Sequence, residues 1–161
     1  MVRASEIRRL CGPDFALLSG DDFTTLPFMA LGGDGIISVL SNVAPAEVVA
    51  LVRAVREGEI LAAQKLHNRL LPLCEALFAE SNPIPVKTAA CWLNIIPSDE
   101  LRLPLSPLSN SGRRLLEESL RGAGFPTVAK APTAPTLGPG MIPGREEREA
   151  QTLDMDEDSC S

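Results

Sequence analysis

The chain has 161 residues, of which 45% are hydrophobic and 22% charged, and its net charge is −6. These values are typical of a globular protein with one domain. The acidic balance, without a basic stripe or an aromatic platform, argues against nucleic-acid binding. No apolar run approaches the ~18 residues of a membrane span. The first residues lack the apolar core of a secretory signal, so we expect no membrane partner and a cytoplasmic location.

Sulfur and imidazole ligands are scattered along the sequence. Cys11, Cys74, Cys91 and Cys160 form no CxxC pair, and His67 is the only histidine. A structural zinc site needs about four such ligands at local spacing, and disulfides are rare in a protein that is not secreted. We therefore expect no metal and no cofactor. Cys74 and Cys91 are expected to be small core residues, and His67 a solvated helix residue.

The first part of the chain predicts a β-α-β unit. Residues 3–11 are expected to be the end of a helix, with Gly12-Pro13-Asp14 as its stop and turn. Short apolar runs predict strands over 15–18 and 35–40. A short helix is expected between the strands, over 23–30. This order is the repeat of a parallel α/β architecture.

Polar and small residues follow or open these two strands. The first strand stops at the Ser-Gly-Asp-Asp sequence of residues 19–22, and the second begins at the glycine-rich segment 32–35. Functional loops gather at the carboxyl ends of parallel strands, so residues 19–22 are candidates for a site. The glycines of 32–35 allow the backbone to come close to a neighbour or a ligand. Two plainer interpretations stay open. Asp21 or Asp22 acts only as a helix cap, and Ile37 is only a core residue.

The downstream part predicts helices over 45–57, 59–79, from 83 or 85 to 93, and over 111–121. Pro72 predicts a kink in the second of these helices. The stripes expected to face inward are Val48, Val49, Val52 and Val55, then Leu66, Leu70, Leu73, Leu77 and Phe78, and finally Leu115, Leu116 and Leu120.

From residue 126 onward the composition changes. The segment is rich in Pro, Gly and Thr, and it ends in an acidic stretch. It contains too little apolar surface to offset the entropy of ordering. We expect residues 126–161 to form a disordered tail.

Three motifs in order resemble the pyruvate-dependent class I aldolase family, which includes dihydrodipicolinate synthase and N-acetylneuraminate lyase. They are LLSGDD at 17–22, GGDGIISVLSN at 32–42 and NPIPVK at 82–87. The resemblance extends over about 2–125. NPIPVK, together with the motifs at 101–104 and 109–113, favours the branch of 4-hydroxy-tetrahydrodipicolinate synthase.

The resemblance implies an α/β fold in which the chain is the C-terminal fragment of a (β/α)8 TIM barrel. Eight strands close such a barrel, and only two are predicted here. Residues 1–58 would be the last βα units and residues 59–125 a C-terminal helical subdomain, followed by the tail.

The same resemblance implies a lyase that condenses pyruvate with aspartate 4-semialdehyde through a lysine Schiff base, in lysine biosynthesis. It places that lysine upstream of Met1, and the catalytic tyrosine is missing because the chain has no Tyr. Lys65, Lys87 and Lys130 are not expected to replace the lysine. The chain would therefore contain no catalytic residue and be inactive alone.

By the resemblance, Ile37 contacts pyruvate, and Gly20 and Asp21 form the pocket rim. A complete enzyme of this kind would be a homo-oligomer, the family tetramer. Two alternatives stay open. The chain is a non-catalytic helical interaction module built on 45–125, or it is a truncated gene product without an evolved function.

Overall fold

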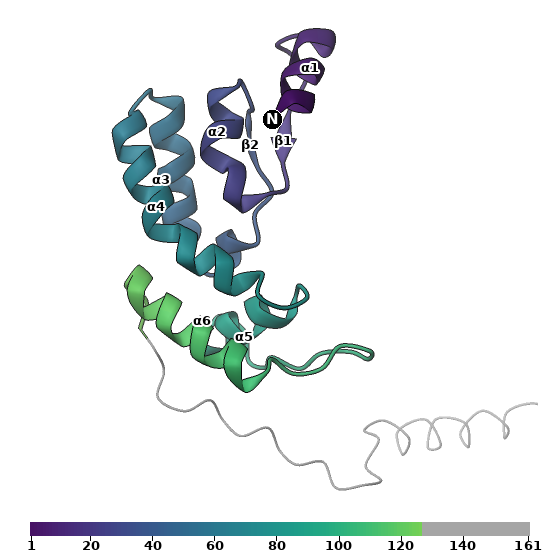
Figure 1. Ribbon diagram of the computed structural model, residues 1–161, viewed down its shortest axis with the longest axis vertical. Coiled ribbons are helices and arrows are strands. Elements are labelled where there is room, and N and C mark those ends of the chain that lie inside the picture. Colours follow the sequence, from purple (N-terminus) through teal and green to yellow (C-terminus); the bar gives the residue numbers. More distant parts are fainter. Residues whose placement is uncertain (127–161) are drawn as a thin grey trace, which may run out of the picture. The chain divides into compact units, whose positions relative to one another are not determined.

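The computed structural model describes residues 1–126, so the predicted tail lies outside the described residues except for Pro126. The described part contains six α-helices, one small sheet and two short 3-10 turns (Figure 1). The elements in chain order are α1 (Val2–Cys11), β1 (Leu18–Ser19), η1 (Asp22–Thr24), α2 (Thr25–Ala30), β2 (Gly35–Ile36), η2 (Leu40–Asn42), α3 (Pro45–Arg56), α4 (Ile60–Leu77), α5 (Ile84–Trp92) and α6 (Asn110–Ala123).

The two strands pair in parallel, as the β-α-β pattern predicts. Leu18 lies opposite Gly35 and Ser19 opposite Ile36. Both strands are shorter than expected, and the predicted strand over 15–18 is wrong before Leu18, since β1 covers only Leu18 and Ser19. The predicted strand over 35–40 is wrong after residue 36, since the chain turns into η2 and its N–H groups donate to the side chain of Asp22 instead of a neighbouring strand.

The predicted helix over 23–30 is divided into η1 and α2. Proline has no N–H, so Pro27 cannot complete an α-helical bond to the carbonyl of Phe23. The first turn is therefore 3-10, and the α-helix begins at Thr25. The cap was predicted correctly, because the Asp21 side chain accepts a hydrogen bond from the N–H of Phe23 at 3.1 Å.

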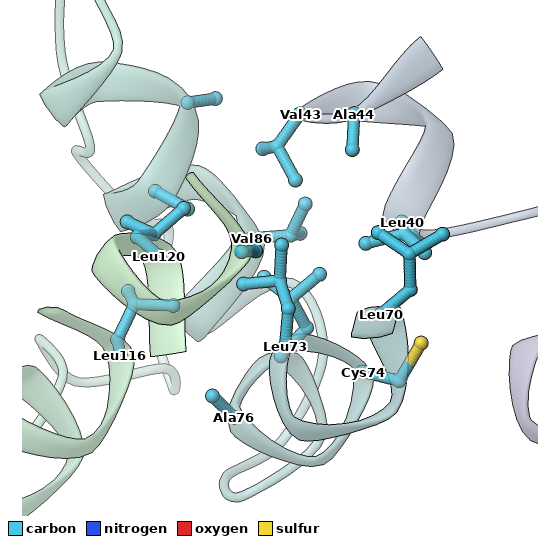
Figure 2. Close-up of a cluster of buried hydrophobic side chains, with 14 of the residues drawn as sticks. Leu40, Val43, Ala44, Leu70, Leu73, Cys74, Ala76, Val86, Leu116 and Leu120 are labelled. Carbon is cyan, nitrogen blue, oxygen red and sulfur yellow. The ribbon is translucent and has the colours of Figure 1, made fainter. Parts of the chain in front are cut away.

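The main hydrophobic core lies among η2 and helices α3 to α6. Helix α4 packs against both α3 and α6. Its apolar stripe and that of α6 meet in the core, and Figure 2 shows part of this cluster. The fully buried leucines of the two helices are Leu70, Leu73, Leu77, Leu116 and Leu120.

Some predicted core positions are wrong. Leu115 is 42% exposed, Val49 is 65% exposed and Phe78 is 38% exposed. Leu115 and Val49 each lie one position away from a buried residue, on the edge of the stripe that faces the core. Helix α4 continues through Pro72, as expected for a helix with a local kink, and Figure 1 shows it bending along its length.

A second, smaller cluster lies near the sheet. It consists of Leu17, Phe28 and Met29, with Ala4 and Ile7 of α1 against it. No residue of α1 is itself buried. The helix is held instead by Arg8, which donates to backbone carbonyls on two loops and pairs with Asp34 at 2.6 Å.

Candidate functional site

The candidate site lies where the two parallel strands end. Gly20 and Asp21 follow β1 directly, and Ile37 follows β2. The strands are parallel and in register, so these residues meet at one edge of the sheet. Ile37 is 70% exposed, and Gly20 and Asp21 are exposed as well. In the part of the chain that is described, Ile37 is therefore available to a ligand and does not fill a core.

The polar groups of Asp21 are used locally. One carboxylate oxygen accepts the N–H of Phe23, and the other accepts the hydroxyl of Thr24 at 2.9 Å. The N–H of Asp21 donates to the side chain of Ser19 at 3.1 Å. These contacts fix the loop after β1 while leaving the carboxylate of Asp21 exposed.

Asp22 joins the loops that follow the two strands. Its side chain is 5% exposed, and Oδ1 accepts the hydroxyl of Ser38 at 2.5 Å. Oδ2 accepts the N–H groups of Val39 at 2.9 Å and Leu40 at 3.3 Å. A carboxylate with several such donors is well satisfied even when buried. This connection was not predicted from the sequence, in which the only indication was one polar residue near the end of each strand.

Two open grooves border this edge of the sheet. The first has a volume of about 630 Å³ and runs between β2 and α3; its lining includes Leu18, Ile36, Ser38 and Val49. The second has a volume of about 590 Å³ and lies between α1 and the end of β1, where Gly20 and Asp21 line it. The structure thus brings Gly20 and Asp21 into one groove. Ile37 lines neither groove, although its neighbour Ser38 lines the first.

A small buried cavity of about 10 Å³ lies behind Asp22, and His67 and Cys74 are among its lining residues. His67 is half-buried there, so it is less solvated than expected. Cys74 is buried as predicted, whereas Cys91 is only partly buried. Burial, with a smaller effect of the nearby Asp22 charge, raises the pKa of the Cys74 thiol to about 12. This thiol therefore stays protonated at neutral pH and is a poor nucleophile or metal ligand.

The two lysines in the described part lie away from both grooves. Lys65 is an exposed residue of α4, and the Lys87 ammonium on α5 donates to the backbone carbonyl of Glu100. Neither lines a groove beside the sheet. Lys130 lies outside the described residues.

Two structural features are absent from residues 1–126. This part of the chain contains no group of three or more His, Cys, Asp or Glu side chains placed to hold a metal ion. In the same residues, none of the helices has the length and apolar character needed to cross a membrane.

Known proteins resemble most of the described chain. The model of the dihydrodipicolinate synthetase family matches residues 1–123. A 4-hydroxy-tetrahydrodipicolinate synthase from Syntrophobacter fumaroxidans is 48% identical over 125 residues, which are 78% of this chain and 43% of the relative. The chain thus spans less than half the length of this curated relative.

Solved structures agree in sequence and in fold. The dihydrodipicolinate synthase of Aquifex aeolicus is 46% identical with a TM-score of 0.75, covering 78% of this chain and 43% of that one. A chloride-inhibited synthase from Acinetobacter baumannii, solved in complex with pyruvate, is 36% identical with a TM-score of 0.72, covering 77% of this chain and 42% of that one. Such structures imply a TIM-barrel family. With a family model matched over most of its length, this chain belongs to the dihydrodipicolinate synthetase family.

Proposed function

We propose that this chain forms one wall of a pyruvate site, with Ile37 against the keto acid and Gly20 and Asp21 at the pocket rim. The observation that supports the proposal most directly is the exposed Ile37 at the same sheet edge as Gly20 and Asp21. A relative 36% identical to this chain has been solved with pyruvate, which makes pyruvate the natural candidate ligand.

The complete protein of this kind would be a lyase that condenses pyruvate with aspartate 4-semialdehyde, as a homo-oligomer in lysine biosynthesis. In this proposal, the chain corresponds to the last two βα units of a TIM barrel and a C-terminal helical subdomain. The names of the related synthases support this activity. The two alternatives, a helical interaction module and a product without function, stay as predictions.

We further propose that the isolated chain does not form the Schiff base itself. A lysine must reach the ketone of pyruvate as a neutral amine to do so. Lys87 is bound to the Glu100 carbonyl, and neither Lys65 nor Lys87 lines the grooves at the strand ends. The chain also lacks tyrosine, so a tyrosine proton relay is not available within it.

Pyruvate binding is tested by NMR titration of the isotope-labelled chain. We expect shifts at the amides of Ile37, Gly20 and Asp21, with lactate as a control that lacks the ketone. Shifts that are absent from these residues, or that appear only on α5 and α6, would contradict the proposal.

Schiff-base formation is tested by borohydride reduction in the presence of labelled pyruvate. We expect no stoichiometric label on the isolated chain, while the complete synthase from Aquifex aeolicus serves as a positive control. Stoichiometric label on the wild-type chain that disappears in Lys87→Arg would show that the chain has its own reactive lysine.

A further inference from the structure

We propose that Asp22 is a positioning residue that holds Ile37 in place relative to Gly20 and Asp21. The inference rests on the proposed function, since it concerns the same pocket wall. It assigns a role to a buried side chain that lines neither groove at the sheet edge.

The hydrogen bonds of the Asp22 side chain all reach across the sheet edge. The residue directly follows Gly20 and Asp21, and its carboxylate accepts one hydroxyl and two N–H groups from residues 38–40. Asp22 takes part in none of the ion pairs formed within residues 1–126. The buried carboxylate thus depends on these donors for its hydrogen bonds. The same bonds hold the Ser38 hydroxyl and the N–H groups of Val39 and Leu40 in place.

Ile37 is held on both sides of its own backbone. Its N–H donates to the Ser19 carbonyl at 2.8 Å. The next residue, Ser38, donates its hydroxyl to Asp22 and accepts the N–H of Ser41 at 2.8 Å. With that acceptor position filled, the Ser38 hydroxyl is oriented toward Asp22. Ile37 thus lies between two anchored points, its own N–H on the Ser19 carbonyl and the Ser38 hydroxyl on Asp22.

The other end of the same two strands offers a matched control. Asp34 precedes β2 and accepts the N–H of Leu17, which precedes β1, at 2.7 Å. It also pairs with Arg8. The two aspartates thus connect opposite ends of one sheet, and only Asp22 lies at the end with Ile37.

The test measures amide hydrogen exchange in the full chain by NMR, as the ratio of the protection factor of Ile37 to that of Leu120. Leu120 is fully buried in α6, so a uniform loss of stability leaves the ratio unchanged. We expect Ser38→Ala and Asp22→Asn to lower the ratio about tenfold, as suits the loss of a charge-assisted hydrogen bond. Ser38→Thr keeps the hydroxyl and should restore the ratio. Asp34→Asn loosens the opposite end of the sheet, so it should lower the ratio clearly less than Ser38→Ala does.

An unchanged ratio in both Ser38→Ala and Asp22→Asn would overturn the proposal, as would an equal fall in Asp34→Asn. If Asp22→Asn fails to fold, Ser38→Ala and its threonine counterpart decide the question. Pyruvate is absent from this measurement, so it is independent of the proposed function. A lowered ratio in a chain whose Ile37 does not respond to pyruvate would support the positioning role and contradict the pyruvate site.

Discussion

Burial determines the chemistry of Cys74, because a thiolate there would lie in an apolar environment beside a carboxylate. The raised pKa of about 12 has a defined consequence for stability. The folded chain favours the protonated thiol more than the unfolded chain does, in which the thiol has its ordinary pKa of 9.0. The stabilising effect is therefore complete below the unfolded pKa of 9.0 and is lost as the pH rises toward the folded pKa.

We predict that alkylation distinguishes the cysteines of the folded chain. At pH 8, iodoacetamide should modify the exposed Cys11 readily and leave Cys74 unmodified, as peptide mapping by mass spectrometry would show. In urea both should react. In alkaline solution the wild type should lose more stability between pH 8 and pH 10.5 than Cys74→Ala does, in denaturant unfolding. Equal labelling of both residues in the folded state would contradict the burial of Cys74.

We predict that Gly33→Ala destabilises the chain, because a Cβ there would overlap the ring carbons of Phe28. Phe28 is 7% exposed in the small cluster, so its ring has little room to move. The expected loss is about 1–3 kcal/mol, as for other overpacked sites. Gly122→Ala is the control, since nothing lies within 4 Å of its Cβ. It should stabilise α6 by about 0.5–1 kcal/mol. Urea unfolding measures both, and equal effects would contradict the steric argument.

Among the elements, α6 shows how a loop far away in sequence fixes the start of a helix. Ser109 caps α6 by accepting the N–H of Gly112 at 3.0 Å. Its hydroxyl also donates to Glu80 at 2.5 Å, and its N–H donates to the same carboxylate oxygen at 3.2 Å. One serine thus joins the N-terminus of α6 to the segment that follows α4.

We predict that Ser109→Ala lowers the free energy of unfolding by about 1–2 kcal/mol, because it removes the cap and a donor to Glu80. Ser109→Asp keeps a capping oxygen but places a second carboxylate beside Glu80, so it should not restore stability at pH 7. The exposed loop residue Ser106, changed to alanine, should shift stability by less than about 0.5 kcal/mol. Chemical denaturation measures all three, and a Ser109→Asp chain as stable as the wild type would contradict the role of Glu80.

Helix positions were predictable because the apolar stripes repeat with the helical period, and α4 and α6 bury most of the leucines that this period selects. Strand lengths were not predictable from the sequence. A strand ends where its hydrogen-bonded partner ends, so its length depends on two segments that lie apart in the chain. The division of the predicted helix at 23–30 had a local sign in Pro27. Leu115 was wrongly predicted to face the core, because helical spacing alone does not show where the apolar stripe ends and the exposed face begins.

The candidate site also shows that the sequence alone does not reveal contacts between distant segments. The motifs placed Gly20 and Asp21 directly after the first predicted strand but Ile37 within the second. The structure ends the second strand at Ile36 and so places all three residues at one sheet edge. The Asp22–Ser38 bond joins residues 16 positions apart, and a contact of this kind appears only once the register of the two strands is known.

At the scale of residues 1–126, apolar burial is unequal. The main core joins α3, α4, α5 and α6, whereas α1 has no buried residue and touches only the small cluster around Phe28. Arg8 adds hydrogen bonds to α1, but these are mostly exposed to water. Local opening is easiest where little apolar surface is buried, so α1 and the sheet should open without the helices of the main core.

We predict that native-state hydrogen exchange separates these regions. Amides of α1 should exchange at least about 100-fold faster than those of the buried faces of α4 and α6. Phe28→Ala should accelerate exchange in α1, α2 and the strands but not in α4 and α6, because its ring belongs to the small cluster. Leu73→Ala, at a fully buried site of the main core, should cost about 2–5 kcal/mol and accelerate exchange throughout. Equal acceleration by both substitutions would contradict this separation, because the strands and the helical core would then unfold as one unit.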